Sequence, residues 1–214
     1  MTRMTEIAHR WPLAGQDGLR DQLLEAYADA GRGYHGLRHL AEVLERLDEL
    51  ALAGATFDRE PVLVAAWFHD AVHAGAADDE ELSAQWAERA LPDTVDVAEV
   101  ARLVRMTAAH RPAAEDANGG ALSDADLAIL AAPSERYQEY VATVRSEYAH
   151  VPDEDFAAGR AAVLADLLAK TTLFHTAAAR ERWEEAARAN VAAELARLRP
   201  PSASGGAGRP GAAR

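Results

Sequence analysis

Residues 61–73 read PVLVAAWFHDAVH, and this stretch decides the fold. Every residue from Val62 to Phe68 is apolar, and Pro61 is a residue favoured in the first turn of a helix. A helix that is apolar on all sides lies buried at the centre of a domain. We therefore predict a central helix that begins near Pro61 and continues through residue 72.

Two polar residues, His69 and Asp70, interrupt this apolar run. Burying a histidine next to an aspartate is costly unless their charge is compensated, and a divalent cation is one good compensation. His73 follows four residues after His69, a spacing that places both side chains on the same face of a continuous helix. The stretch that predicts the core therefore also predicts a polar site inside it.

Helical periodicity continues on both sides of this stretch, from about residue 14 to residue 198, and no segment is typical of a strand. Thr94 and Ser123 are the expected N-caps of two helices, and the stretch 111–121, which contains two adjacent glycines, is expected to be a loop. The other expected helices cover residues 14–30, 35–52, 78–91, 94–110, 124–130, 133–149, 153–170 and 176–198. The sequence thus predicts a single all-α domain over residues 1–198, followed by a disordered Pro/Gly/Ala/Ser-rich tail over residues 199–214.

The composition agrees with a helical protein and restricts its chemistry. Alanine accounts for 51 of the 214 residues and aromatic residues for only 6%, a balance that favours helix over sheet. The chain has no cysteine, which excludes a disulfide framework, a zinc finger and a thiol nucleophile. Any metal ion must therefore be held by histidine and carboxylate side chains.

The charge excludes one class of partner. The net charge is −13, and it is −17 once the arginine-containing residues 197–214 are set aside. So acidic a chain lacks the basic surface of a protein that binds a nucleic acid polymer, although a bound divalent cation still allows a small phosphate ester. No apolar run approaches the ~20 residues of a membrane span, and no signal peptide is evident, so we expect a cytoplasmic protein without a membrane partner.

Further polar residues lie in apolar helical patterns on either side of the central helix. His35 and His39 are four residues apart, and Asp124 and Asp126 enter the start of another apolar segment. Helix capping explains Asp124 as well as a role in the site does. Asp126, in contrast, has apolar neighbours on both sides. Nitrogen and oxygen ligands without sulfur suit Mn, Fe, Co, Ni, Zn or Mg, and imidazole favours the transition metals.

This order of residues, H…HD…D on successive predicted helices, resembles the HD-domain superfamily of metal-dependent phosphohydrolases. Over about residues 11–197 the chain is similar to a bacterial group of predicted metal-dependent HD phosphohydrolases. The sequence departs from that group at His73, where tyrosine is expected, and at Asp79, where asparagine is expected. The motifs that carry the resemblance are R-x-YHxxxH (32–39), AAWFHDxV (65–72), E-x-x-SA (80–84), T-x-x-H (107–110), DADLAIL (124–130), YxxYxxxVRxEY (137–148), F-x-x-GR (156–160) and E-x-x-AR-x-N (184–190).

The resemblance implies an all-α HD-domain helical bundle and a divalent metal ion held by His39, His69, Asp70 and Asp126. It implies hydrolysis, by a metal-activated water, of a phosphomonoester or phosphoanhydride of a nucleotide or another small phosphorylated metabolite. Asp70 and Glu80 are the expected catalytic residues, with Glu80 donating or relaying the proton for the leaving oxygen. An acidic helix N-terminus is the alternative explanation for Glu80.

The expected substrate contacts are His35, His110, Arg145 and Arg160. His35 is alternatively an auxiliary metal ligand. His110 resembles an additional histidine of HD proteins with more than one metal ion, although a cation at a helix C-terminus explains it equally well. Arginines four residues from acids are commonly surface ion pairs. We expect the site to hold a single, tightly bound metal ion. The sequence does not predict the oligomeric state.

Two other functional classes stay open at the level of sequence. One is a di-iron oxygenase of the HD type, in which the surplus His35, His73 and His110 supply a second iron. The other is a sensor that binds a nucleotide or metal ion without turnover.

Overall fold

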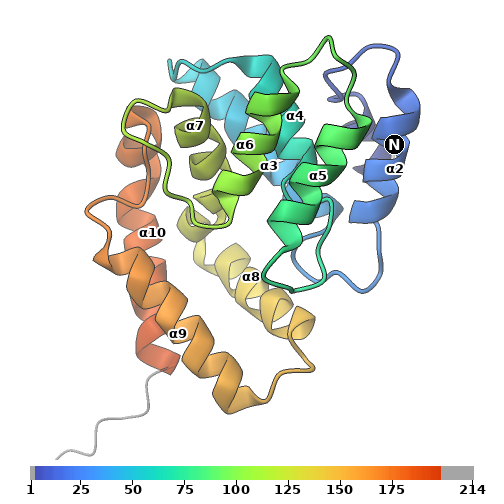
Figure 1. Ribbon diagram of the computed structural model, residues 1–214. Helices are drawn as coiled ribbons and strands as arrows, with labels where there is room; N and C mark the ends of the chain where they lie inside the picture. Colours follow the sequence, from blue (N-terminus) through green and yellow to red (C-terminus); the bar gives the residue numbers. More distant parts are fainter. Residues whose placement is uncertain (1–2, 199–214) are drawn as a thin grey trace, which may run out of the picture.

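The computed structural model describes residues 3–198; residues 1–2 and the predicted tail 199–214 lie outside the described residues. Over residues 3–198 the chain forms ten α-helices and one short 3-10 helix, with no strand (Figure 1). The all-α prediction is confirmed. The elements are α1 (Arg3–Ala8), α2 (Asp17–Tyr27), α3 (Leu37–Leu52), α4 (Arg59–Phe68), α5 (Asp79–Ala90), α6 (Val97–Thr107), α7 (Ala117–Leu127), η1 (Ala128–Ala131), α8 (Ser134–Glu147), α9 (Asp153–Ala169) and α10 (Ala177–Leu198).

Helix α4 lies at the centre of the bundle, as its apolar sequence predicts. It contacts α3, α5, α6 and α7. Trp67 and Phe68 are fully buried, and truncating such a side chain to alanine costs about 3–5 kcal/mol. Because α4 is enclosed on these sides, the residues that follow it are held in fixed positions. No helix within residues 3–198 is both long enough and apolar enough to cross a membrane.

Helix α4 ends at Phe68, so the predicted continuation to residue 72 was wrong. The reason is that polar side chains satisfy the backbone beyond this point. The guanidinium of Arg32 donates to the carbonyl oxygens of Asp70 and Ala71 at 2.6 and 2.8 Å, and the N–H of Val72 donates to Ser83 Oγ at 3.0 Å. The chain therefore turns after His69, and His73 does not continue the helical face of His69.

Helix α7 begins at Ala117, inside the segment that the sequence predicts as a loop. Asp116 caps it by accepting the N–H of Gly119 at 2.8 Å. A Cβ at Gly119 would lie 2.3 Å from Asp116 Oδ2, and one at Gly120 would lie 3.2 Å from His175 Cβ. The two glycines thus allow close approach within a helix. The loop prediction was correct for residues 111–116 and wrong for residues 117–121.

The two predicted N-caps were also wrong. Ser123 lies buried inside α7, and α6 is capped by Asp96, which accepts the N–H of Glu99 at 3.1 Å, rather than by Thr94. In both cases an aspartate closer to the first helical turn satisfies the free backbone donors. The sequence also gave no indication of the short helix α1, which buries Ile7.

Helices α8 and α9 extend away from the rest of the bundle, and α10 packs against α9 and η1 (Figure 1). A buried polar network joins these helices. Glu194 of α10 accepts hydrogen bonds from Tyr137 Oη of α8 and from the guanidinium of Arg160 of α9. The network fixes α8, α9 and α10 relative to one another and forms one wall of the cavity described below.

Asp124 connects α7 to the start of α10. Its carboxylate is fully buried and accepts the N–H groups of His175 and Thr176, both at 2.7 Å. Burial raises the pKa of Asp124 to about 6, against the opposing effect of these two backbone donors. Of the two explanations that the sequence allowed, Asp124 takes the capping one, although the backbone that it caps precedes α10 rather than its own helix.

We expect Asp124→Ala to lower the free energy of unfolding by about 2–4 kcal/mol, because two buried N–H groups lose their acceptor at about 1–3 kcal/mol each. Urea denaturation measures this. Asp93→Ala, which replaces an exposed acid, is the control and should change stability by less than about 0.5 kcal/mol. Equal stability of the two variants would contradict the capping role.

Candidate metal centre

Four polar side chains from three helices meet in the interior of the bundle. His39 lies in the first turn of α3, His69 and Asp70 follow the last turn of α4, and Asp126 lies in the last turn of α7. Nε2 of His39 is 3.0 Å from Nε2 of His69, and it is 3.2 Å from both Asp70 Oδ2 and Asp126 Oδ1. Nε2 of His69 is 3.1 Å from Asp70 Oδ2 and 3.7 Å from Asp126 Oδ1. These are the four residues for which the family resemblance implies metal ligation.

The tautomer of His69 is fixed by the backbone of the preceding helix, α4. Nδ1 of His69 lies 2.8 Å from the carbonyl oxygen of Ala66, and because a carbonyl only accepts, Nδ1 must donate. The neutral imidazole therefore carries its lone pair on Nε2, which faces Asp70 Oδ2 and His39 Nε2. Electron pairs at such separations repel one another unless a proton or a metal ion lies among them.

The cluster is electrostatically prepared for positive charge. Burial lowers the pKa of His39, but the adjoining carboxylates of Asp126 and Asp70 outweigh it and raise that pKa to about 10. The same carboxylates raise the pKa of His69 against its burial. Burial works against the ionised form of Asp126, yet His69 and His39 hold its pKa well below the usual value. Two carboxylates thus stabilise a cation between them.

The donor set and its spacing fit a transition-metal ion. Ligand atoms about 2.0–2.2 Å from one ion lie about 2.8–3.6 Å apart in tetrahedral or octahedral arrangements, close to the separations observed here. Two imidazoles with two carboxylates suit such ions better than Mg²⁺ or Ca²⁺. In addition, Asp70 Oδ2 and His39 Nδ1 are buried and have no hydrogen-bond partner within residues 3–198. The residues present could therefore hold the implied ion.

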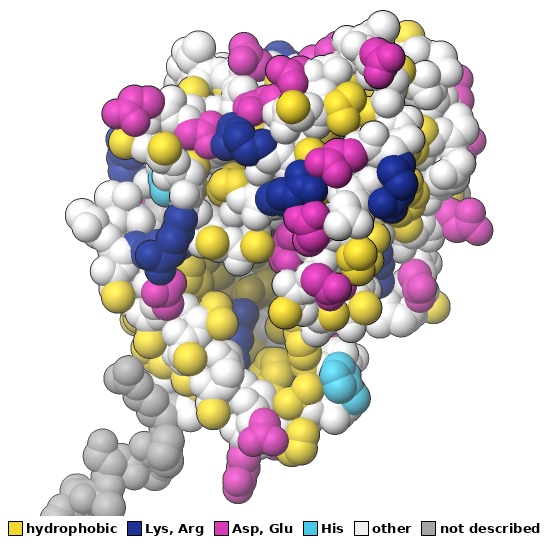
Figure 2. Space-filling model, viewed as in Figure 1, with side chains coloured by type: hydrophobic (Ala, Val, Ile, Leu, Met, Phe, Trp, Pro, Cys, Tyr) yellow, Lys and Arg dark blue, Asp and Glu magenta, His cyan; other side chains and the backbone are white. Residues whose placement is uncertain are grey.

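Asp70 and Asp126 line a cavity of about 670 Å³. Figure 2, in the same view as Figure 1, shows a hollow in the surface that is bordered mainly by hydrophobic side chains and has a basic side chain inside it. The predicted site residues His35, Glu80, His110 and Arg160 line the same cavity. The fold therefore brings most of the predicted site residues to one place.

His110 and Glu80 flank the cluster in this cavity. Nε2 of His110 is 3.5 Å from Asp126 Oδ2, and its Nδ1 is 3.1 Å from Ser123 Oγ. His110 has a φ of +48°, a left-handed conformation that is uncommon for a residue other than glycine. Burial raises the pKa of Glu80, and the charge of Asp70 adds to this effect. An upward shift of its pKa is the direction that suits a proton donor.

The two arginines predicted to contact substrate make contacts within the fold. Arg145 does not line the cavity; its guanidinium donates to Tyr148 O and Val151 O in the connection between α8 and α9. Arg160 lines the cavity, but its guanidinium is paired with Glu194, with Nε 2.8 Å from Oε1. Arg160 is therefore a wall residue whose charge is already compensated.

Lys170 is a cavity residue that the predicted site does not include. It follows α9, lines the cavity and donates from Nζ to the carbonyl oxygen of His110 at 3.1 Å. Arg111, also at the cavity, is paired with Asp166 at 2.9 Å, whereas Lys170 forms no ion pair within the described part of the chain. Lys170 is the only lysine in the sequence, and this feature could have indicated that it belongs to the site.

Glu147 is a second residue whose role the sequence did not reveal, although it lies inside the quoted motif YxxYxxxVRxEY. Its carboxylate accepts the backbone N–H groups of Gly33 and His35, and Nδ1 of His35 lies 2.8 Å from Oε2. His35 is thereby held beside the cluster, while His39 lies within it.

Comparisons of the chain with protein-family models, with curated proteins and with solved structures each find no match. The interpretation of the cluster therefore depends on its own geometry and on the sequence motifs.

We expect Asp70→Ala to lose the ion of this cluster, because it removes one ligand and half of the local negative charge. Elemental analysis after dialysis should show one ion fewer per chain than in the parent protein, while circular dichroism shows the same helicity. Asp93→Ala, the exposed control, should retain full occupancy. Full occupancy in Asp70→Ala would exclude this cluster as the metal centre.

Proposed function

We propose that the chain is a metal-dependent phosphohydrolase that cleaves a phosphomonoester or phosphoanhydride of a nucleotide or another small metabolite. The observation that supports this most strongly is the convergence of His39, His69, Asp70 and Asp126 on one point at the edge of a 670 Å³ cavity. The motifs of the sequence, which resemble those of HD phosphohydrolases, support the same reaction.

In this proposal the four clustered residues hold a divalent ion at the reacting end of the cavity. When bound, such an ion lowers the pKa of a coordinated water and polarises a phosphoryl oxygen. Asp70, whose Oδ2 has no hydrogen-bond partner in the described chain, orients the attacking water. Glu80 faces the same cavity and donates the proton that the leaving oxygen needs.

Recognition of the phosphate falls to Lys170 and His110. Lys170 brings a positive charge that no carboxylate within residues 3–198 neutralises by an ion pair, and a charge-assisted hydrogen bond to a phosphate oxygen is among the stronger polar contacts. Its hydrogen bond to His110 O fixes the position of the ammonium group. His110 lies between this group and Asp126, so the phosphate would bind across them.

The organic part of the substrate has a separate, mainly apolar space. A second cavity of about 450 Å³ adjoins the first between α8 and α9 and shares His35, Tyr140, Arg160 and Val163 with it. Its remaining lining residues are Val144, Tyr148, Val151, Asp155, Phe156 and Gly159. Aromatic rings such as those of Tyr148 and Phe156 favour a flat or apolar group, so a base or a comparable ring fits this space.

The proposal is tested by measuring phosphate release from p-nitrophenyl phosphate and from nucleoside mono- and triphosphates with added Mn²⁺, Co²⁺ or Zn²⁺. We expect metal-dependent turnover that is lost in Asp126→Ala. Tight nucleotide binding without turnover would instead indicate a sensor. An iron–oxo absorption band in anaerobically handled protein would indicate an oxygenase.

We expect Lys170→Gln to raise KM by about 10- to 100-fold, because a hydrogen bond to a charged group contributes about 1.5–3 kcal/mol. Steady-state kinetics on the best substrate measures this, and metal content should stay unchanged. Lys170→Arg should recover most of the affinity. Arg89→Gln, at an exposed arginine of α5 that does not line the cavity, is the matched control, and an equal rise in KM for that variant would contradict the assignment.

A further inference from the structure

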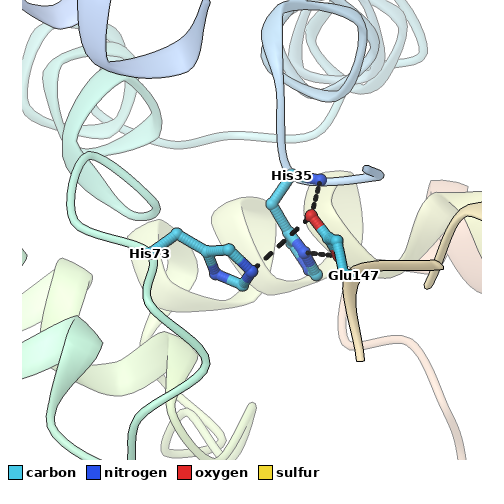
Figure 3. Close-up of side chains that lie close together, drawn as sticks. All are labelled: His35, His73 and Glu147. Carbon is cyan, nitrogen blue, oxygen red and sulfur yellow. Dashed lines mark hydrogen bonds and ion pairs between the residues drawn. The ribbon is translucent and has the colours of Figure 1, made fainter. Parts of the chain in front are cut away.

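A second group of metal-ligating side chains lies outside the cluster described above. His35 precedes α3, His73 lies in the turn after α4, and Glu147 is the last residue of α8. One ligand atom from each lies within 4.8 Å of those of the other two. Figure 3 shows the two imidazole rings and the carboxylate directed toward one another. Three segments far apart in the sequence thus converge here.

Within residues 3–198, no hydrogen bond accounts for the position of His73. Its Nε2 is 3.6 Å from Glu147 Oε1, and its Nδ1 is 4.0 Å from Asp79 Oδ2; both separations are too long for a hydrogen bond. Its ring nevertheless lies against that of His35, with 4.1 Å between the ring centroids and 33° between the planes. Only 13% of the His73 side chain is exposed. A largely buried imidazole therefore points at a carboxylate without forming a hydrogen bond to it.

The carboxylate of Glu147 is held firmly in place. Only 5% of the side chain is exposed, and Oε1 accepts the N–H groups of Gly33 and His35 at 2.9 and 3.0 Å. A carboxylate offers about four acceptor sites, so the contact of Oε2 with His35 Nδ1 at 2.8 Å still leaves one open. Backbone donors that orient a ligating carboxylate are typical of metal sites.

We propose that His35, His73 and Glu147 form a second cation site, distinct from the His39–His69–Asp70–Asp126 cluster, that binds a transition-metal ion such as Zn²⁺. Two imidazoles and one glutamate are a donor set that zinc uses with a water in the fourth position, and imidazole nitrogen is a poor ligand for Mg²⁺ or Ca²⁺. On binding, the ion replaces the proton between His35 Nδ1 and Glu147 Oε2, and this proton is released to solvent.

The second site does not use His110, the histidine that the sequence suggests for a second ion. The sequence offers His110 for a second ion, but His110 lies near Asp126 and donates to or accepts from Ser123. His73, which stands where the resembling group has tyrosine, completes the second group instead. The rings of His35 and His39 lie 5.6 Å apart between centroids, so the two sites are neighbours on either side of this pair. In this proposal the chain holds two ions, whereas the sequence led us to expect one.

The test uses the full chain and titrates Co²⁺, because its visible absorption reports coordination by imidazole and carboxylate. His73→Gln is the variant of choice, since His73 forms no hydrogen bond in the described part of the chain, whereas replacing Glu147 would also free two backbone donors. His9→Gln, at an exposed histidine, is the matched control. Elemental analysis with Zn²⁺ gives the stoichiometry independently, and both readouts are free of any activity assay.

We expect two Co²⁺ ions per chain in the parent protein and in His9→Gln. One should remain in His73→Gln, one in Asp126→Ala, and none in the double variant. The affinity of the second site should fall at least about tenfold in His73→Gln. A single ion in the parent that persists in His73→Gln would overturn the second site. Two ions retained in Asp126→Ala but one in His73→Gln would refute the first cluster and leave the second site standing.

Discussion

The guanidinium of Arg32 holds together the two segments that carry four of the eight histidines. It donates to the carbonyl oxygens of Asp70 and Ala71 and to that of His35, and each hydrogen bond from a charged group contributes about 1.5–3 kcal/mol. Helix α4 cannot continue because its following carbonyls are bonded to Arg32, and the loop before α3 cannot move away from that turn. The positions of His35, His39, His69 and His73 all depend on this contact.

The buried acids of the protein differ in how their charge is compensated, and this difference distinguishes the candidate metal centre. Asp124 accepts two backbone N–H groups, and Glu194 is paired with Arg160 and Tyr137. Asp70 and Asp126 face imidazoles instead, and Asp70 Oδ2 has no hydrogen bond within the described chain. A buried carboxylate that lacks a fixed donor is costly, so the fold tolerates it where a cation can bind.

Hydrogen bonds and ion pairs likewise distinguish the basic residues that support the fold from those that are available to bind a ligand. Arg145 and Arg160 are bonded to backbone carbonyls, to Glu194 and to the Tyr140 hydroxyl, and they fix the geometry of α8, α9 and α10. These helices form the wall of the cavity, while Lys170 carries the charge into it. The same lobe therefore supplies both shape and charge to the proposed substrate site.

The sequence by itself determined the all-α class and the buried central helix, because apolar periodicity is a local property. The set His39, His69, Asp70 and Asp126 came from the resemblance of the motifs to HD phosphohydrolases; the structure brings the four side chains together, and their role as metal ligands stays a prediction. Six of the predicted site residues, His35, Asp70, Glu80, His110, Asp126 and Arg160, line the candidate cavity, whereas Lys170 and other lining residues such as Tyr34, Arg111 and Tyr140 were not predicted. The ends of helices were less predictable: α4 stops where Arg32, some forty residues earlier, bonds to its carbonyls, and Gly119 and Gly120 are helical because Asp116 and His175 approach them closely. Only the tertiary structure decided that Asp124 caps a distant segment, that Arg160 is paired with Glu194, and that His73 meets His35 and Glu147. Each of these outcomes depends on contacts between segments far apart in the chain, and no local pattern of residues encodes which partner a charged side chain will meet.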